Sequence, residues 1–144
     1  MLHLAYPVQL IPESGGHFTV LFPDLPEAIT SGANRADALI QAVDCLEESI
    51  AGRIADGLEI PVPSPSTQQP TVPLTWSMAA KASLYLALRE SGVTQTELAR
   101  RLGVDEKEVR RMLDPRHATK LPRIEAALAA LGRRLVIQLE TVAA

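Results

Sequence analysis

Three basic side chains recur at helical spacing in the segment EKEVRRML (106–113). Lys107, Arg110 and Arg111 stand at positions i, i+3 and i+4, so they share one face if the segment is helical. Lysine and arginine on an exposed helix can neutralise DNA phosphates, and an arginine can donate two hydrogen bonds to a guanine. This spacing therefore favours nucleic-acid binding.

Two short helices joined by a tight turn would place these side chains. Thr94 and Asp105 are typical N-cap residues, and each is followed three positions later by a glutamate, as in a capping box. Gly103 permits a sharp bend, and Ala99 is small enough for two helices to cross. The pattern predicts a helix-turn-helix whose second helix enters the major groove. The predicted DNA-binding residues are Gln95, Thr96, Glu106, Lys107, Arg110, Arg111, Arg116 and Lys120.

Other interpretations of this region stay open. Glu106 and Glu108 lie near the basic face and repel phosphate. Capping accounts for Glu108, whereas Glu106 either contacts a cytosine amine or weakens binding. The loop DPRHATK (114–120) either contacts the DNA backbone or is simply solvated. The whole region could be a plain helical bundle with a solvated basic face, but the caps, the glycine turn and the small crossing residue together favour DNA binding.

The charge of the chain is divided between its two halves. The 144 residues carry a net charge of −3. Residues 1–63 contain two basic and nine acidic side chains, whereas residues 77–144 contain twelve basic and eight acidic ones. Such an asymmetry indicates two partners of opposite charge. The segment PVPSPSTQQPTVP (61–73), with five prolines and no charge, is typical of an extended connector. We therefore expect a domain at 1–63, a linker at 64–76 and a second domain at 77–144.

The hydrophobic pattern predicts an α+β fold. Alternation of apolar residues and turn signals predict strands in the first domain at 2–10, 17–22, 28–30 and 58–60. Asn34 is a plausible N-cap for a helix that ends near Asp56. Helices capped by Ser77 and starting near Pro122 flank the two short helices, and a strand is expected at 134–140. The order is a β-β-β-α-β domain followed by a helical domain that ends in a short strand.

These segments resemble the HicB antitoxins of bacterial type II toxin–antitoxin systems. The resemblance rests on YPVQL, ESGGHFTVLFPDLPEAITSG, ADALIQAVDCLEESI, DGLEIPVPS and RHATKLPRIEAALAALGRRL. It implies a partial RNase H-like N-terminal domain that neutralises a HicA-type toxin, a small basic ribonuclease. It also implies a C-terminal domain that binds operator DNA and represses the operon. The toxin-binding candidates, chosen by charge alone, are Asp24, Glu27, Asp44, Glu47 and Glu48.

The resemblance further implies a homodimer or homotetramer. The expected strand at 134–140 has no partner within a small helical domain. We therefore expect it to pair with its equivalent in a second chain, since an open apolar edge invites another strand.

Two other functions are less well supported. Asp24, Asp44 and Glu48 could hold magnesium in a nuclease, but solvated carboxylates are the favoured interpretation, and we expect no enzyme, metal or cofactor. The alternative function is a stand-alone helix-turn-helix regulator with an acidic sensor or protein-interaction domain. The single cysteine, Cys45, and the absence of a signal peptide or a membrane-length apolar run predict a cytoplasmic protein with no membrane partner.

Overall fold

A small antiparallel sheet opens the fold. The structure is a computed structural model that describes residues 1–143. Strands β2 (Gln9–Pro12), β3 (Phe18–Leu21) and β4 (Ile29–Gly32) form the sheet in the order β2-β3-β4. Each pairs with its neighbour through a register that places Val20 opposite both Leu10 and Thr30. The expected hairpin and short third strand are confirmed, and the fold is of the mixed α and β kind.

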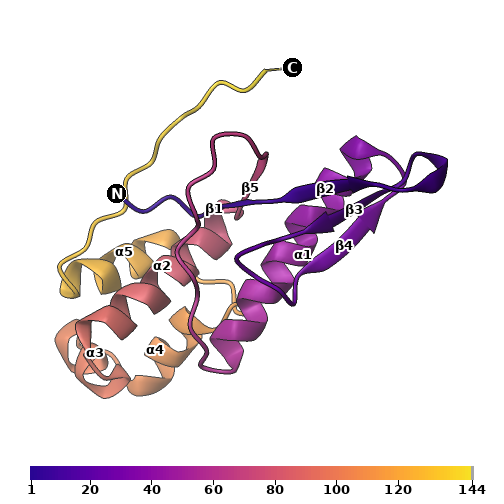
Figure 1. Cartoon of the computed structure of the whole chain (residues 1–144). Helices are drawn as coiled ribbons and strands as arrows, with labels where there is room; N and C mark the ends of the chain where they lie inside the picture. Colours follow the sequence, from indigo (N-terminus) through magenta and orange to yellow (C-terminus); the bar gives the residue numbers. More distant parts are fainter. Residues whose placement is uncertain (144) are drawn as a thin grey trace.

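The long helix α1 (Arg35–Ala55) covers one face of this sheet (Figure 1). It begins as expected, because the side chain of Asn34 accepts a hydrogen bond from the N–H of Asp37 at 2.8 Å. Its first turn lies against the end of β4. A Cβ atom added to Gly32 would lie 2.2 Å from the backbone nitrogen of Ala38, so only glycine fits there. This contact fixes where the helix crosses the sheet.

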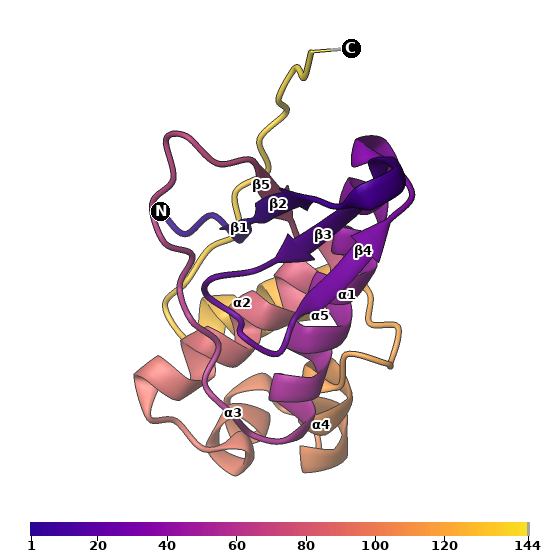
Figure 2. The same cartoon turned by 45° about the vertical axis from the view of Figure 1, so that its right-hand side comes forward.

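Four further helices form the second part of the molecule (Figure 2). They are α2 (Trp76–Ser91), α3 (Gln95–Leu102), α4 (Glu106–Leu113) and α5 (Leu121–Ala130). The expected cap at Ser77 is wrong, because Thr75 is the residue before the first turn and its side chain makes no capping bond. The N–H of Thr75 instead donates to a carboxylate oxygen of Glu47 on α1 at 2.8 Å.

The expected linker is partly built into the fold. Strand β5 (Thr71–Pro73) pairs antiparallel with β1 (Ala5–Pro7). The single strand expected at 2–10 is therefore interrupted at Val8, whose N–H donates to the carbonyl oxygen of Pro70 at 2.9 Å. The strand expected at 58–60 is wrong. The carbonyl oxygens of Leu58 and Glu59 instead accept hydrogen bonds from side chains of α2 and α1.

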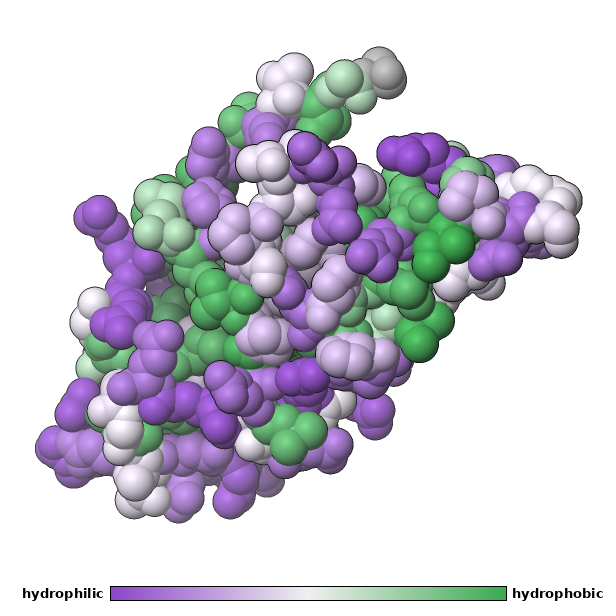
Figure 3. Space-filling view, in the orientation of Figure 1, coloured by the Kyte–Doolittle hydropathy of each residue, from purple (hydrophilic) through white to green (hydrophobic). Residues whose placement is uncertain are grey.

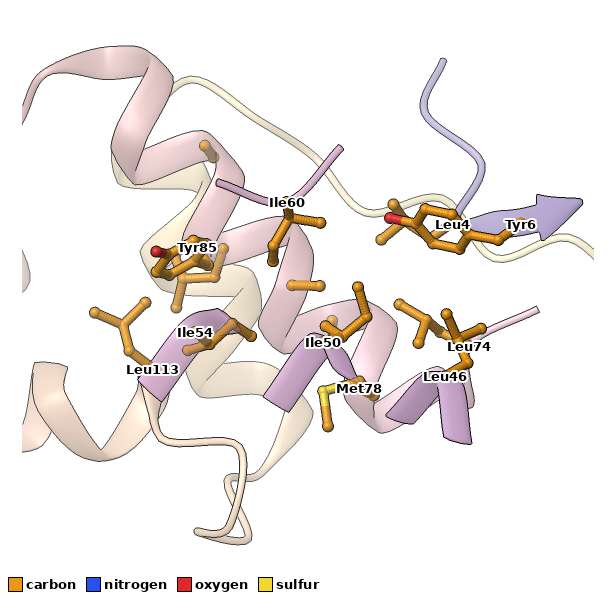
Figure 4. Packing of buried hydrophobic residues seen from close by; sticks show 14 of the residues in the cluster. Leu4, Tyr6, Leu46, Ile50, Ile54, Ile60, Leu74, Met78, Tyr85 and Leu113 are labelled. Atoms are coloured by element: carbon orange, nitrogen blue, oxygen red, sulfur yellow. The ribbon is translucent and has the colours of Figure 1, made fainter. Parts of the chain in front are cut away.

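One hydrophobic core runs through both parts of the chain. Met78 and Tyr85 of α2 lie beside Ile50 and Ile54 of α1 (Figure 4), and all four belong to one cluster of buried residues. The Tyr85 hydroxyl donates to the carbonyl oxygen of Leu58 at 2.7 Å. Close by, Arg89 donates to the carbonyl oxygen of Gly57 at 3.0 Å. The helical part is thus held against α1 by apolar packing and by hydrogen bonds.

The expected strand at 134–140 is not formed within this chain. Residues 133–143 leave α5 as an extended tail that points away from the helices (Figure 1). Ile137 is 86% exposed and Leu139 is 97% exposed. A strand requires a neighbouring backbone that bonds its N–H and C=O groups, and residues 133–143 form no such ladder in the single chain. Among the described residues, no helix is long and apolar enough to span a membrane.

Candidate nucleic-acid and protein interfaces

The turn between α3 and α4 is shaped by two caps and one glycine. Thr94 Oγ1 accepts a hydrogen bond from the N–H of Glu97 at 3.1 Å, and Asp105 Oδ1 accepts one from the N–H of Glu108 at 2.9 Å. Gly103 has a φ of +66°, a left-handed conformation that favours glycine. The sequence therefore predicted both helix starts and the bend between them.

The outer surface of α4 carries the predicted basic residues. Lys107, Arg110 and Arg111 are all exposed, and Val109 and Met112 are buried on the opposite side. Arg111 donates to Glu108 at 3.0 Å, and Arg123 of α5 donates to the other oxygen of the same carboxylate at 2.7 Å. The Glu108 carboxylate therefore holds two arginines side by side at one edge of the surface.

A shallow hollow of about 280 Å³ continues this basic surface toward α5. Its lining includes Arg111, His117, Lys120 and Arg123. Arg116 is exposed in the same loop. The structure thus brings the loop residues next to α4. Arg123 was not among the sequence candidates, although its place in the first turn of α5 lies only three residues after Lys120.

Two of the predicted DNA-binding residues, Gln95 and Thr96, lie in α3. Thr96 is exposed and Gln95 is partly buried, both in the first turn of α3. Further along, the Glu97 carboxylate accepts hydrogen bonds from Arg100 at 2.6 Å and from Arg101 at 3.2 Å. The bonds from these two arginines lower the pKa of Glu97 to about 2. Arg100 and Arg101 are therefore already paired with a carboxylate. Lys107 and Arg110, in contrast, form no ion pair within the described residues.

A buried lysine anchors α4 and the loop that follows it. Lys81 of α2 is only 4% exposed. Its Nζ donates to the carbonyl oxygens of Arg111 and Met112 at 3.1 and 3.0 Å, and to Thr119 Oγ1 at 2.8 Å. Burial lowers the pKa of Lys81, and the negative charge of Asp114 partly opposes this shift. Sequence reasoning missed this residue, although a lysine between apolar positions of α2 was a visible signal.

Replacing the Lys81 ammonium group should lower the stability of the helical part of the protein. Lys81→Met keeps an unbranched side chain that is one atom shorter and cannot donate hydrogen bonds. We expect the free energy of unfolding to fall by about 1–3 kcal/mol, because buried carbonyl oxygens lose their donor. Thr119→Val removes only one of the three partners, so it should cost less. Urea denaturation of both variants measures the effect, and a Lys81→Met protein as stable as the unmodified chain would contradict this role.

Three of the five acidic candidates hold the fold together. Asp24 accepts hydrogen bonds from the N–H and the hydroxyl of Ser64 at 2.8 and 2.6 Å. Glu27 pairs with Arg53 of α1 at 2.7 Å, and Glu47 accepts the N–H of Thr75 described above. These bonds satisfy carboxylates that sequence reasoning had assigned to a partner by charge alone.

The other two acidic candidates face solvent. Asp44 and Glu48 are exposed and stand one turn apart on α1. The carboxylate of Asp24, the third member of the nuclease hypothesis, instead accepts hydrogen bonds from Ser64. Within residues 1–143 no group of three or more histidine, cysteine, aspartate or glutamate side chains could hold a metal ion.

The pairing of Glu27 predicts a pH-dependent stability. Hydrogen bonds from Arg53 lower the pKa of Glu27 from 4.5 to about 2. A carboxylate with a lowered pKa stabilises the fold above its unfolded value, and this contribution is lost as the pH falls from about 4.5 toward 2. The Glu27 side chain is 45% exposed, so solvent limits the contribution to about 1 kcal/mol or less.

Glu27→Gln should therefore be less stable than the unmodified chain at pH 6, and the difference should be smaller at pH 3, where part of the contribution of Glu27 is already lost. Urea unfolding at both pH values measures the difference. Glu48→Gln, a change to an exposed carboxylate, is the control and should show no such convergence. A constant difference between the Glu27→Gln and unmodified proteins across this range would contradict the role of the ion pair.

The molecule joins an acidic sheet-bearing part and a basic helical part on one hydrophobic core. Residues 5–83 match the family described as HicB_like antitoxin of bacterial toxin-antitoxin system. The chain belongs to this family of HicB-like antitoxins. Its homologues are named antitoxins, which are not enzymes, and this chain is likewise not an enzyme.

The similarity to individual relatives extends over nearly the whole chain. The chain is 40% identical to Antitoxin HicB 1 of Photorhabdus laumondii over 139 residues, which are 96% of this chain and 88% of the relative. It is 38% identical to Antitoxin HicB of Escherichia coli K12 over 133 residues, 92% of this chain and 96% of the relative. Antitoxin HicB of Pseudomonas fluorescens is 34% identical over 90% of each chain. An antitoxin implies a toxin partner.

Proposed function

We propose that this antitoxin neutralises a HicA-type ribonuclease toxin through residues 1–63 and represses its own operon by binding operator DNA through α3 and α4. The observation that carries the DNA-binding half is the exposed trio Lys107, Arg110 and Arg111 on the second of two tightly joined helices. Both activities belong in the cytoplasm, where operator and messenger RNA are found.

The geometry of the basic surface supports the proposal of DNA binding. A helix whose polar side is exposed and whose apolar side is buried can enter the major groove as the second helix of a helix-turn-helix. Lys107 and Arg110 are then available for phosphates or base edges, and Gln95 and Thr96 stand at the start of α3, where N–H groups favour a phosphate. Lys120, Arg116 and Arg123 would extend the phosphate contacts beside the groove.

Toxin neutralisation rests on family membership and on charge. Residues 1–63 carry nine acidic side chains against two basic ones. A basic ribonuclease that grips RNA would be attracted to such a domain. The sheet covered by α1 is compatible with the proposed partial RNase H-like fold, and the strand that follows α1 is β5 rather than residues 58–60. Among the acidic candidates, Asp44 and Glu48 keep exposed carboxylates for long-range attraction.

We also propose that two or more chains associate through the C-terminal tail. A groove of about 890 Å³ lies between the N-terminal residues, α2, α5 and the tail, and the exposed Trp76 lines it. The apolar tail residues would bury their side chains and satisfy their backbone groups against a second copy. A paired arrangement would present two α4 helices to a palindromic operator. The mass of the full chain in solution, measured by light scattering, tests this proposal.

One experiment tests both proposed activities. The chain is co-expressed with the small basic protein encoded beside its gene, and growth rescue and co-purification are scored. The purified chain is then titrated with DNA from upstream of the operon. Rescue and specific DNA binding are expected. Specific DNA binding without any neighbouring toxin partner would instead favour a stand-alone regulator.

A further inference from the structure

The carboxylate of Glu108 joins two helices. Within residues 1–143 it bonds to two arginines rather than to the N–H of Asp105, which the predicted capping box would require. Its Oε1 accepts a hydrogen bond from Arg111 of α4 at 3.0 Å, and its Oε2 accepts one from Arg123 of α5 at 2.7 Å. One side chain therefore holds a guanidinium group of each helix.

Both arginines keep donors for another partner. Each donates to Glu108 through Nη1, and a guanidinium has further N–H groups on its other nitrogens. Arg100 of α3 differs, because both its Nε and its Nη2 donate to Glu97. The side chains of Arg111 and Arg123 are 44% and 55% exposed, whereas that of Glu108 is 29% exposed. The carboxylate is thus the more buried partner, and the arginines retain exposed donors for an anion.

The backbone around this bridge is also held in place. Lys81 Nζ donates to the carbonyl oxygen of Arg111 and to Thr119 Oγ1, so it joins the end of α4 to the loop before α5. The hollow of about 280 Å³ described above is lined by Arg111, Lys120 and Arg123. Figure 3 shows mostly hydrophilic surface over the lower part of the molecule, where α3 and α4 lie. Three basic side chains therefore meet at a site whose backbone is fixed.

A carboxylate that orients an arginine changes how the arginine binds. A free arginine loses side-chain conformational freedom when it binds a phosphate, and this loss opposes binding. An arginine that is already held loses less freedom and presents its planar group of donors in one direction. Exposed ion pairs contribute little to stability. The bridge through Glu108 is therefore expected to act on the geometry of Arg111 and Arg123 more than on folding.

We propose that Glu108 is a positioning residue for operator recognition, which orients Arg111 and Arg123 toward the DNA backbone. Phosphate contacts fix the register in which other side chains of α4 meet the base edges. The negative charge of Glu108 also repels phosphates, so it weakens binding to DNA of any sequence while it strengthens the preference for the operator. The proposal rests on the operator binding proposed above and names a residue that sets its specificity. The competing interpretation is that Glu108 only reduces the positive charge of the surface.

Two substitutions of Glu108 separate these interpretations. Glu108→Gln removes the charge, whereas Glu108→Asp keeps the charge but shortens the reach of the carboxylate. Each full-length variant is titrated with a duplex from upstream of the operon and with a shuffled duplex of the same length. Both variants are expected to lower the ratio of operator affinity to shuffled-duplex affinity by about tenfold. A role of charge alone would raise both affinities together in Glu108→Gln and leave Glu108→Asp unchanged.

Glu125→Gln is the matched control for the change of charge. Glu125 is exposed on α5, two residues after Arg123, and forms no ion pair within the described part of the chain. This variant should keep the affinity ratio of the unmodified chain to within about twofold, because two sites that share no partner act independently. Thermal unfolding of every variant checks that it is folded at the assay temperature. If Glu108→Gln unfolds, Glu108→Asp carries the test, because it keeps an acidic residue in the first turn of α4.

A double-mutant cycle shows whether Glu108 acts through its arginines. In an Arg123→Gln background, Glu108→Gln should lower the affinity ratio less than it does in the unmodified chain, because one of the arginines that it orients is gone. Full additivity would overturn the proposal, as would an unchanged ratio in both Glu108 variants or a lowered ratio in Glu108→Gln alone. An equal loss in Glu125→Gln would also overturn it. If the unmodified chain binds both duplexes equally, the proposed operator binding itself fails.

Discussion

Arg110→Ala combined with Arg111→Ala is expected to abolish operator binding while toxin neutralisation stays intact. Both side chains lie on the exposed surface of α4, and their loss removes two positive charges from the proposed groove contact. A bidentate contact between an arginine and a base is worth about 1–3 kcal/mol. Each lost phosphate contact reduces the slope of the logarithm of the binding constant against the logarithm of the salt concentration by about 1. The double variant should therefore lose at least about a hundredfold in affinity.

Fluorescence anisotropy with an operator duplex at several salt concentrations measures this effect. Arg35→Ala, a change to an exposed arginine at the start of α1, is the matched control and should bind operator normally. Growth rescue against the toxin is scored in parallel for all proteins. Unchanged operator affinity in the double variant would refute the assignment of α4 to DNA. Simultaneous loss of growth rescue would show that the two activities do not separate along the chain.

Gly32→Ala is expected to destabilise the protein severely. The added Cβ atom would lie 2.2 Å from the backbone nitrogen and 2.4 Å from the Cα atom of Ala38. Both belong to the first turn of α1, whose backbone cannot move without shifting the helix on the sheet. Overpacking of a rigid site typically costs 1–3 kcal/mol and sometimes more. We expect a loss of about 3 kcal/mol or more, measured by urea or thermal unfolding.

Gly52→Ala is the matched control for this substitution. Gly52 lies within α1, and nothing stands within 4 Å of an added Cβ atom there. Alanine is favoured over glycine inside a helix by about 1 kcal/mol, so this variant should be as stable as the unmodified chain or more stable. Equal unfolding midpoints for the two glycine variants would argue against the close packing of β4 on α1.

Local signals in the sequence were sufficient for much of this fold. Asn34, Thr94 and Asp105 cap their helices as predicted, since a cap depends only on residues three positions apart. Gly103 adopts the left-handed bend that its position suggested. The apolar alternation around β3 likewise placed Val20 and Phe22 inside. Each of these predictions depends on neighbours in the chain, which a single sequence displays.

Features that depend on distant segments could not be predicted in this way. The pairing of β5 with β1 joins residues more than sixty positions apart, and a proline-rich segment gave no sign of it. The roles of Lys81 and Glu47 depend on carbonyl and N–H groups of other elements. Net charge alone could not distinguish Asp24, which binds Ser64, from the exposed Asp44.

The core shared by α1 and α2 has a consequence for how such an antitoxin is removed from a cell. Met78 and Tyr85 cannot stay buried if α1 detaches, because Ile50 and Ile54 form part of their surroundings. Local unfolding of α1 would therefore also disrupt the packing of α2, so that the two parts of the molecule unfold cooperatively. Under the function proposed above, a protease that captures the opened chain would release the toxin and derepress its gene in a single event.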